Sequence, residues 1–276
     1  MNNTTIDWLL SDDNPAVKYR TQTEILDQPA DKVLVLEWLN DFLPADWTAR
    51  TGLWFRYYIT AFAECGLSYN DIPLDKETII GFGSTFPFEH SCADYMQLRA
   101  LVKLGLADEP KVAEIIRHLP ERQLPDGGFL CLHRVDKMKR IPKSCVKANM
   151  YALLFCAKCK KRGISTKIEQ PLLDYFWKHK LFYRSYDPET LILNARKGWR
   201  TIDTFYPFEV MRVGLQNIVE AFCTLGYGND GRLHEAWDLL NNQSDADGKV
   251  ILRGTPSKSY LPKERCGKPS KWATFN

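Results

Sequence analysis

The chain has 276 residues, a length that fits one large domain or two small ones. Hydrophobic residues make up 45% and charged residues 26% of the chain, which excludes a disordered or fibrous protein as a description of the whole. Lysine and arginine number 37 against 34 aspartates and glutamates. This balanced charge argues against nucleic acid or acidic lipid as the main partner.

The first ten residues, MNNTTIDWLL, show neither the basic region nor the apolar core of a secretory signal. No run of about 18 apolar residues occurs, so the sequence predicts no membrane span. We therefore expect a cytoplasmic protein. Its eight cysteines are then expected to be thiols or metal ligands rather than disulfides.

Apolar residues recur at helical spacing along the chain, in segments that mostly end at glycine or proline. In chain order these segments are 34–42 before Pro44, 54–62 before Gly66, 98–104 before Gly105, 112–119, 151–159 before Gly163, 172–177, 219–225 before Gly226, and 233–240. No alternation of useful length indicates a β-strand. The predicted fold class is therefore all-α.

Residues 98–127 and 219–248 match as two copies of one unit. Each copy has an apolar helix, a glycine that stops it, a turn, a second helix and an Asp-Gly turn that reverses the chain. The second helix of each copy carries four apolar residues on one face, so each unit is predicted to be an αα-hairpin. A hairpin cannot bury its apolar face alone, so neighbouring hairpins are expected to stack.

The first Asp-Gly turn lies in residues 123–129, which read QLPDGGF and resemble the Q-x-x-D-G-x-W motif of squalene and terpene cyclases. The second copy, residues 243–250, is degenerate. Its Gln lies one residue further from the Asp-Gly pair, and the motif does not end in an aromatic residue. In that family the Gln bonds backbone at a helix end and the aromatic ring stacks on the neighbouring hairpin. Segments 13–20, 143–145 and 267–272 are also similar to small bacterial proteins of the prenyltransferase and squalene-cyclase-like superfamily.

The resemblance implies an α/α toroid of about five to six helical hairpins, with inner helices around a central cavity and outer helices around them. This single domain would span residues 1–276, with loop insertions at 183–207 and a C-terminal tail at 254–276. Such toroids carry cyclases, protein prenyltransferases and lanthionine cyclases, and the fold alone does not choose among them. The chain lacks the D-x-D-D acid of class II terpene cyclases and the D-D-x-x-D set that binds diphosphate through Mg²⁺. Cyclisation by protonation is therefore not expected.

Cysteine and histidine residues gather between positions 90 and 145, at the predicted starts of inner helices and in the turns between them. They are His90, Cys92, Cys131, His133 and Cys145. Zn²⁺ takes Cys and His in a tetrahedral shell, and a catalytic zinc site leaves one position open. The resemblance to zinc-containing toroids supports a metal at one mouth of the cavity. The predicted zinc ligands are Cys92, Cys131, His133 and Cys145. The alternative is that the cysteines are buried filler and the histidines bind nothing.

Two aromatic-Pro loops, residues 86–90 and 203–209, look alike and precede predicted inner helices. Glu89 in the first loop is the best candidate for a general base, provided that it faces the cavity.

The second catalytic candidate is Cys145, since a thiolate is favoured at a helix N-terminus. Three residues are predicted to bind the ligand: His90, Asp203 and Tyr206. Helix capping is the alternative role of Asp203.

Two basic runs, residues 137–140 and 158–162, are most simply solvated surfaces. The first is also placed to meet an anionic group such as a diphosphate, and the second ends a helix, where positive charge offsets the dipole. Within the same helix, Cys156 and Cys159 form a C-x-x-C pair that lies on the apolar stripe. These two thiols are therefore expected to face the core rather than bind zinc.

The leading hypothesis is a terpenoid-cyclase- or prenyltransferase-like protein that binds a small or isoprenoid-like ligand in its central cavity. Aromatic side chains near the predicted inner-helix starts suit such a ligand. Any reaction would be zinc- or thiol-dependent and would use the Cys/His site. The alternative hypothesis is a non-catalytic binding or scaffold protein that keeps only the toroid fold.

Overall fold

The computed structural model describes residues 2–81, 92–130, 144–181, 214–254 and 261–276. Within these ranges the regular structure is helical, and the only extended pairing consists of two isolated bridges, Ser244 with Val250 and Ile251 with Pro269. The predicted all-α fold class is confirmed for this part of the chain. None of the helices found there is both long and apolar enough to cross a bilayer.

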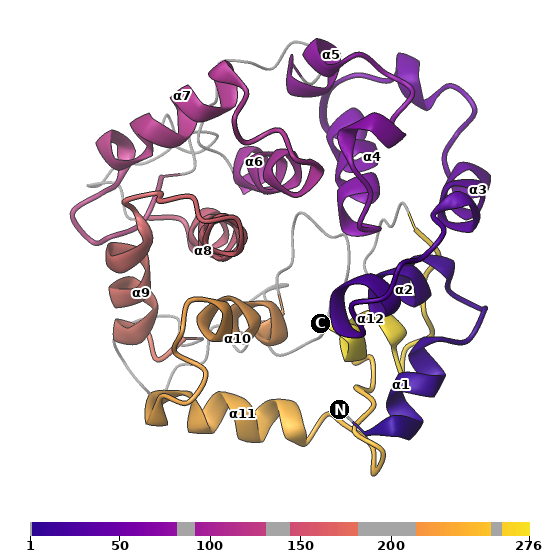
Figure 1. Ribbon diagram of the computed structural model, residues 1–276. Coiled ribbons are helices and arrows are strands. Elements are labelled where there is room, and N and C mark those ends of the chain that lie inside the picture. The colour runs from indigo at the N-terminus through magenta and orange to yellow at the C-terminus, as the bar shows by residue number, and fades with distance from the viewer. Residues whose placement is uncertain (1, 82–91, 131–143, 182–213, 255–260) are drawn as a thin grey trace.

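The helices alternate along the chain between an inner and an outer position (Figure 1). Those nearer the centre are α2 (Pro15–Arg20), α4 (Gly52–Glu64), α6 (Cys92–Leu104), α8 (Val146–Lys161), α10 (Leu215–Thr224) and α12 (Lys271–Phe275). Those at the periphery are α1 (Asn3–Leu9), α3 (Val33–Phe42), α5 (Lys76–Gly81), α7 (Pro110–His118), α9 (Glu169–Lys178) and α11 (His234–Asn241). The predicted loop insertion at 183–207 lies outside the described residues.

Packing follows the same alternation. α6 packs against both α4 and α8, and α8 also packs against α10. The outer helices α3, α9 and α11 each pack on the preceding inner helix, namely α2, α8 and α10. Because α8 has neighbours on several sides, it is buried over most of its length, whereas α7 buries only Val112 and Ile116. The apolar core therefore lies between the two sets of helices.

Glycine residues end four helices as the sequence predicts. Gly66, Gly105, Gly163 and Gly226 have φ angles of +81°, +91°, +69° and +100°. This left-handed conformation strains residues that carry a Cβ atom, so glycine at these positions stops each helix without a steric cost. The helix segments and their glycine stops, including those of the two repeat copies, are thus confirmed.

The Asp-Gly turn of residues 123–129 joins neighbouring hairpins. The Nε2 atom of Gln123 donates to the carbonyl of Gly127 at 2.7 Å and to that of Ile168, just before α9, at 3.1 Å. A Cβ atom on Gly127 would lie 2.2 Å from a backbone oxygen of the α9 segment, so only glycine fits this approach. Phe129 is fully buried, and its ring centroid lies 4.9 Å from that of Tyr95 in α6. The glutamine thus makes a backbone contact at a helix end, while the aromatic ring packs within its own hairpin.

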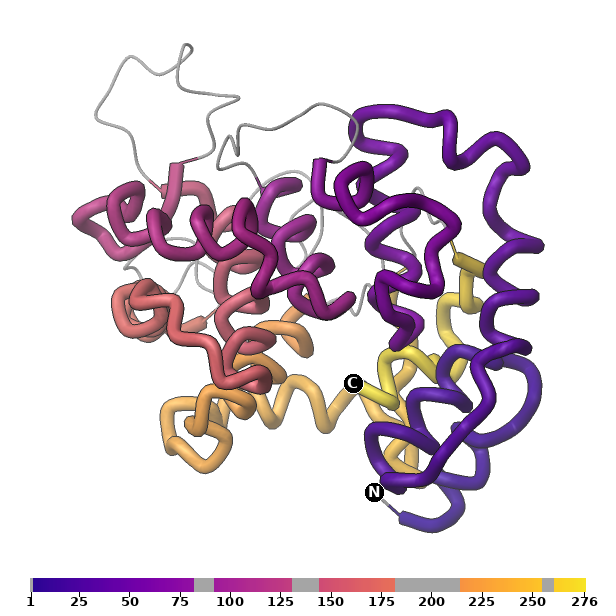
Figure 2. Tube along the Cα trace, turned by 45° about the horizontal axis from the view of Figure 1, so that its top comes forward, coloured from indigo at the N-terminus to yellow at the C-terminus, as the bar shows by residue number. Residues whose placement is uncertain are grey.

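The two ends of the described chain meet, as Figures 1 and 2 show. α12 packs against α2, and Trp272 is 1% exposed. The amine of Lys271 donates to the carbonyl oxygen of Ser11 at 3.0 Å and to its hydroxyl at 2.6 Å, and it pairs with the carboxylate of Asp13. Segments 13–20 and 267–272, which carry part of the family resemblance, therefore contact each other.

Candidate functional site

Two of the eight site residues predicted from sequence lie in the described part of the chain. Cys92 is the first residue of α6, and Cys145 directly precedes α8, so both stand at helix starts as predicted. Both side chains are half-buried. The other six, which lie outside the described residues, are Glu89, His90, Cys131, His133, Asp203 and Tyr206.

The predicted zinc site remains a prediction. Among the described residues, no group of three or more His, Cys, Asp or Glu side chains is arranged to hold a metal ion. Two of the four predicted ligands, Cys131 and His133, lie outside those residues. The presence of the site therefore depends on a segment that the structure does not describe.

The C-x-x-C pair of α8 is part of the core. Cys156 is 1% exposed and Cys159 is fully buried. Burial raises the pKa of both thiols, that of Cys156 to about 12. Thiols with such high pKa values are neutral at pH 7 and are poor nucleophiles and metal ligands. The prediction that they face the core is confirmed.

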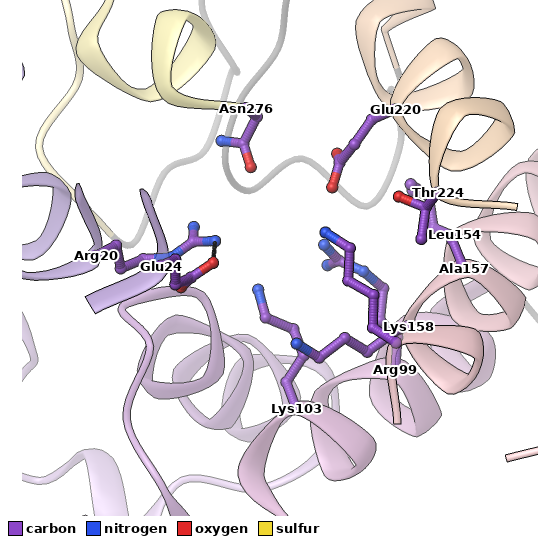
Figure 3. A pocket seen from close by; sticks show the side chains of 11 residues that line it. Arg20, Glu24, Arg99, Lys103, Leu154, Ala157, Lys158, Glu220, Thr224 and Asn276 are labelled. Carbon is purple, nitrogen blue, oxygen red and sulfur yellow. Dashed lines mark hydrogen bonds and ion pairs between the residues drawn. The ribbon is translucent and has the colours of Figure 1, made fainter. Parts of the chain in front are cut away.

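A polar cavity of about 50 Å³ lies where the final turns of several inner helices converge (Figure 3). We call it the hub pocket. Its lining residues are Arg20, Glu24, Arg99, Lys103, Leu154, Ala157, Lys158, Lys161, Glu220, Thr224 and Asn276. Five of these side chains are basic and two are acidic, so positive charge dominates the lining.

Helix geometry explains why cations gather at this place. Arg99 and Lys103 lie one turn apart at the end of α6, Lys158 lies in the last turn of α8, and Arg20 ends α2. A cation in the last turn stabilises a helix by offsetting the negative end of its dipole. On separate surface helices such cations would point into solvent. Here the helices converge, and their cations share one cavity.

A buried carboxylate, Glu64 at the end of α4, holds two of these cations. Its Oε2 atom accepts a hydrogen bond from the amine of Lys103 at 2.5 Å, and its Oε1 atom accepts one from Arg99. Burial raises the pKa of Glu64, but the charges of Arg99, Lys103 and Arg20 outweigh it and hold the pKa well below its usual range. Glu64 is therefore ionised, and a single carboxylate serves two cations.

Two lysines of the hub pocket, Lys103 and Lys158, have lowered pKa values. Burial lowers the pKa of Lys103 to about 7, with Arg99, Arg20 and Lys158 adding to the shift and Glu64 opposing it. Burial likewise lowers the pKa of Lys158 to about 8, although the negative charge of Glu24 opposes this shift. In both cases burial, together with the neighbouring cations, outweighs the attraction of the carboxylate.

Arg20 reaches the pocket from the segment of residues 13–20. Its Nε and Nη2 atoms donate to the two carboxylate oxygens of Glu24 at 2.6 and 2.9 Å. The guanidinium carbon lies 4.3 Å from the centroid of the Phe275 ring in α12. Gly66 makes room for the Arg20 side chain, because a Cβ atom there would lie 3.0 Å from its Cγ atom. Both chain ends therefore help to position this cation.

Glu220 in α10 lines the side of the hub pocket opposite Glu24 (Figure 3). Its Oε2 atom is buried and has no hydrogen-bond donor among the described residues. Figure 3 shows this carboxylate and the amine of Lys158 directed into the same space. The pocket can thus bind an anionic group through its cations and a hydrogen-bond donor through Glu220.

The hub pocket is the site that the sequence analysis missed. The run of residues 158–162 is predicted to be a solvated helix end, but the structure places Lys158 in the pocket. One signal was present, because Lys158 follows Leu154 by one helical turn and therefore continues a buried row of α8. A cation on an apolar row indicates an internal polar site rather than a solvated surface.

Comparisons with known proteins do not indicate what the hub pocket binds. No protein-family model matches the chain, and no curated protein matches it either.

Proposed function

We propose that the chain is an α/α toroid that binds a small anionic ligand, such as a phosphate-bearing molecule, in the hub pocket. The observation that carries this proposal is the excess of basic over acidic side chains among the described residues that line one pocket. The cations nearest the ligand would be Arg20, Arg99, Lys103 and Lys158. The alternation of inner and outer helices around a common centre supports the toroid (Figure 1).

A lining in which the described cations outnumber the described carboxylates favours an anion. Hydrogen bonds between Arg or Lys and a phosphate or carboxylate are short and stronger than neutral ones. They gain further strength in a partly desolvated cavity, where the effective dielectric constant is lower than in water. A cavity of about 50 Å³ holds a few water molecules or one phosphate-sized group. The rest of a larger ligand would therefore extend beyond the pocket.

This function accommodates the isoprenoid-like ligand that the family resemblance implies. An isoprenoid phosphate has one compact anionic group, which would enter the hub pocket, and an apolar chain that would extend beyond it. Zinc- or thiol-dependent chemistry at Cys92, Cys131, His133 and Cys145 would be an additional property. The binding function does not require it, and a non-catalytic binding protein remains within the proposal.

Calorimetric titration with pyrophosphate at pH 7 tests the proposal. We expect Lys158→Met to weaken binding at least tenfold, which corresponds to about 1.4 kcal/mol, because it removes a charge-assisted contact. Lys160→Met is the matched control, since Lys160 is exposed on the same helix. Equal affinity of the two variants, or no binding of pyrophosphate at millimolar concentration by the wild type, would overturn the proposal.

The pH dependence of anion binding gives a second test. Lys103 and Lys158 lose their protons in the unliganded protein as the pH rises through about 7 and about 8. An anion binds the protonated lysines better, so its affinity falls as the pH increases from 7 to 9, and binding takes up protons. Sulfate is the suitable probe, because its own charge is constant over this range. An affinity that is independent of pH would contradict the assigned role of the lysines.

A further inference from the structure

A second hollow is lined by residues of the α2 segment and of the peripheral helix α3. We call it the α2–α3 groove, and its volume is about 530 Å³. Its lining residues are Asp12, Pro15, Lys18, Tyr19, Gln22, Asp31, Leu34, Val35, Glu37, Trp38 and Asp41. The groove shares none of these residues with the hub pocket, so it is an independent site.

The outward face of α3 is unusually apolar. Val33, Leu34 and Phe42 are 50%, 58% and 46% exposed, although α3 already buries Val35 and Leu39 against the core. Every exposed large apolar side chain of the described residues comes from positions 25–54: Ile25, Val33, Leu34, Phe42, Leu53 and Trp54. Three of these six side chains, Val33, Leu34 and Phe42, belong to α3, so exposed apolar residues are concentrated on this helix.

Two parallel rows of side chains run along this face. Leu34, Trp38 and Phe42 follow one another at intervals of one helical turn, and the rings of Trp38 and Phe42 lie 5.4 Å apart. Beside them, Glu37 and Asp41 also lie one turn apart. Like charges at this spacing repel each other and weaken a helix. α3 itself contains no lysine or arginine to balance them.

The charge of the groove is strongly acidic. Its lining contains four carboxylates and one cation, Lys18, whose amine already pairs with Asp12 at 2.6 Å. Asp31 stands just before the start of α3, where its Oδ1 atom accepts from the backbone of Val33 at 2.9 Å. A basic partner would therefore find an apolar row flanked by carboxylates along most of α3.

We propose that the α2–α3 groove docks an amphipathic, basic helix of a partner protein. Its apolar residues would cover Leu34 and Trp38, and its Lys or Arg side chains would face Glu37 and Asp41. Helices recognise grooves in this way through apolar anchors spaced three and four residues apart. Tryptophan is among the side chains that contribute most to such interfaces, and Trp38 is half-buried at the groove. Charge complementarity selects a basic partner over an acidic one.

Selection from a phage-displayed library of random 16-residue peptides, with the full chain as target, tests the proposal. We expect the enriched peptides to share apolar residues at helical spacing and Lys or Arg beside them. A synthetic peptide of that consensus should bind the variant Glu37→Lys with Asp41→Lys at least tenfold more weakly than it binds the wild type. The same peptide with Glu in place of its basic residues should prefer the variant.

The matched control is Glu114→Lys with Asp238→Lys, which changes the net charge equally on the exposed faces of α7 and α11. Equal loss of affinity in the two double variants, or a consensus without basic residues, would overturn the proposal. Sedimentation of the chain alone tests whether a second copy of this chain occupies the groove instead of a basic helix. A dimer that dissociates on Leu34→Asp would assign the groove to a second copy of this chain and would also overturn the proposal.

Discussion

The two ends of the α4–α6 interface use charge in different ways. Near the starts of these helices, Arg56 donates to Asp94 at 2.6 Å, and both side chains are buried. Near their ends, Glu64 meets both Arg99 and Lys103, and the hub pocket adds further cations. Among the described residues, the first arrangement joins one cation to one carboxylate. Counted over the same residues, the second brings together more cations than carboxylates.

We interpret this difference as that between a structural ion pair and the proposed binding site. Buried charges are costly unless they are paired, so a protein that needed charge only to join two helices would match each cation with a carboxylate. The excess at the hub pocket is a cost in the unliganded protein that a bound anion would remove. Variants at the two ends of the interface should therefore behave differently in stability and in ligand affinity.

The largest effect is expected for Glu64→Gln, which leaves Arg99 and Lys103 buried without their carboxylate. Removing one partner of a buried ion pair typically costs about 3–5 kcal/mol of unfolding free energy. The loss should be smaller at pH 9 than at pH 6, because Lys103 can lose its proton. Urea unfolding measures both values. Glu114→Gln on the exposed face of α7 is the control, and it should change stability by less than about 0.5 kcal/mol.

The pH dependence of stability should show a smaller effect. Lys103 has a pKa of about 7 in the folded protein, against the ordinary lysine value of 10.5 in the unfolded chain. Between these values the unfolded chain binds more protons, so the free energy of unfolding rises with pH, by about 1–3 kcal/mol from pH 7 to 9. The variant Lys103→Met should lack this rise. Identical pH profiles for wild type and variant would show that Lys103 is not perturbed by its surroundings.

The smallest effect is expected at the balanced end. Replacing Arg56 and Asp94 together, by Met and Leu, removes both charges at once and should change the free energy of unfolding by only about 1 kcal/mol in either direction. Pyrophosphate affinity should stay within twofold of the wild type. A tenfold loss of affinity would show that the two ends of the interface are coupled, and the distinction between them would fail.

Local features of the fold were predictable because they depend on residues close in sequence. Apolar spacing predicted the helices, and glycine stops such as Gly105 and Gly226 confirmed their ends. The hub pocket depends instead on Arg20, Arg99 and Lys158, which meet only in the folded chain. No local sequence pattern predicts that these three residues come together. The one local signal is a cation, such as Lys158, that continues an apolar row of a helix. The predicted Cys/His site keeps its status as a prediction, because most of its residues lie outside the described part of the chain.

The contact between α12 and α2 has a consequence for biosynthesis. Lys271 and Ser11, which it joins, are 260 positions apart in the chain. In a nascent polypeptide, the side of α2 that contacts α12 therefore stays uncovered until the segment around residue 271 has also been translated. Contacts of such long range form late, because the loop between them must first be closed. Phe275 reaches Arg20 only after this segment has emerged, so chains that lack it would expose an unfinished pocket to chaperones and proteases.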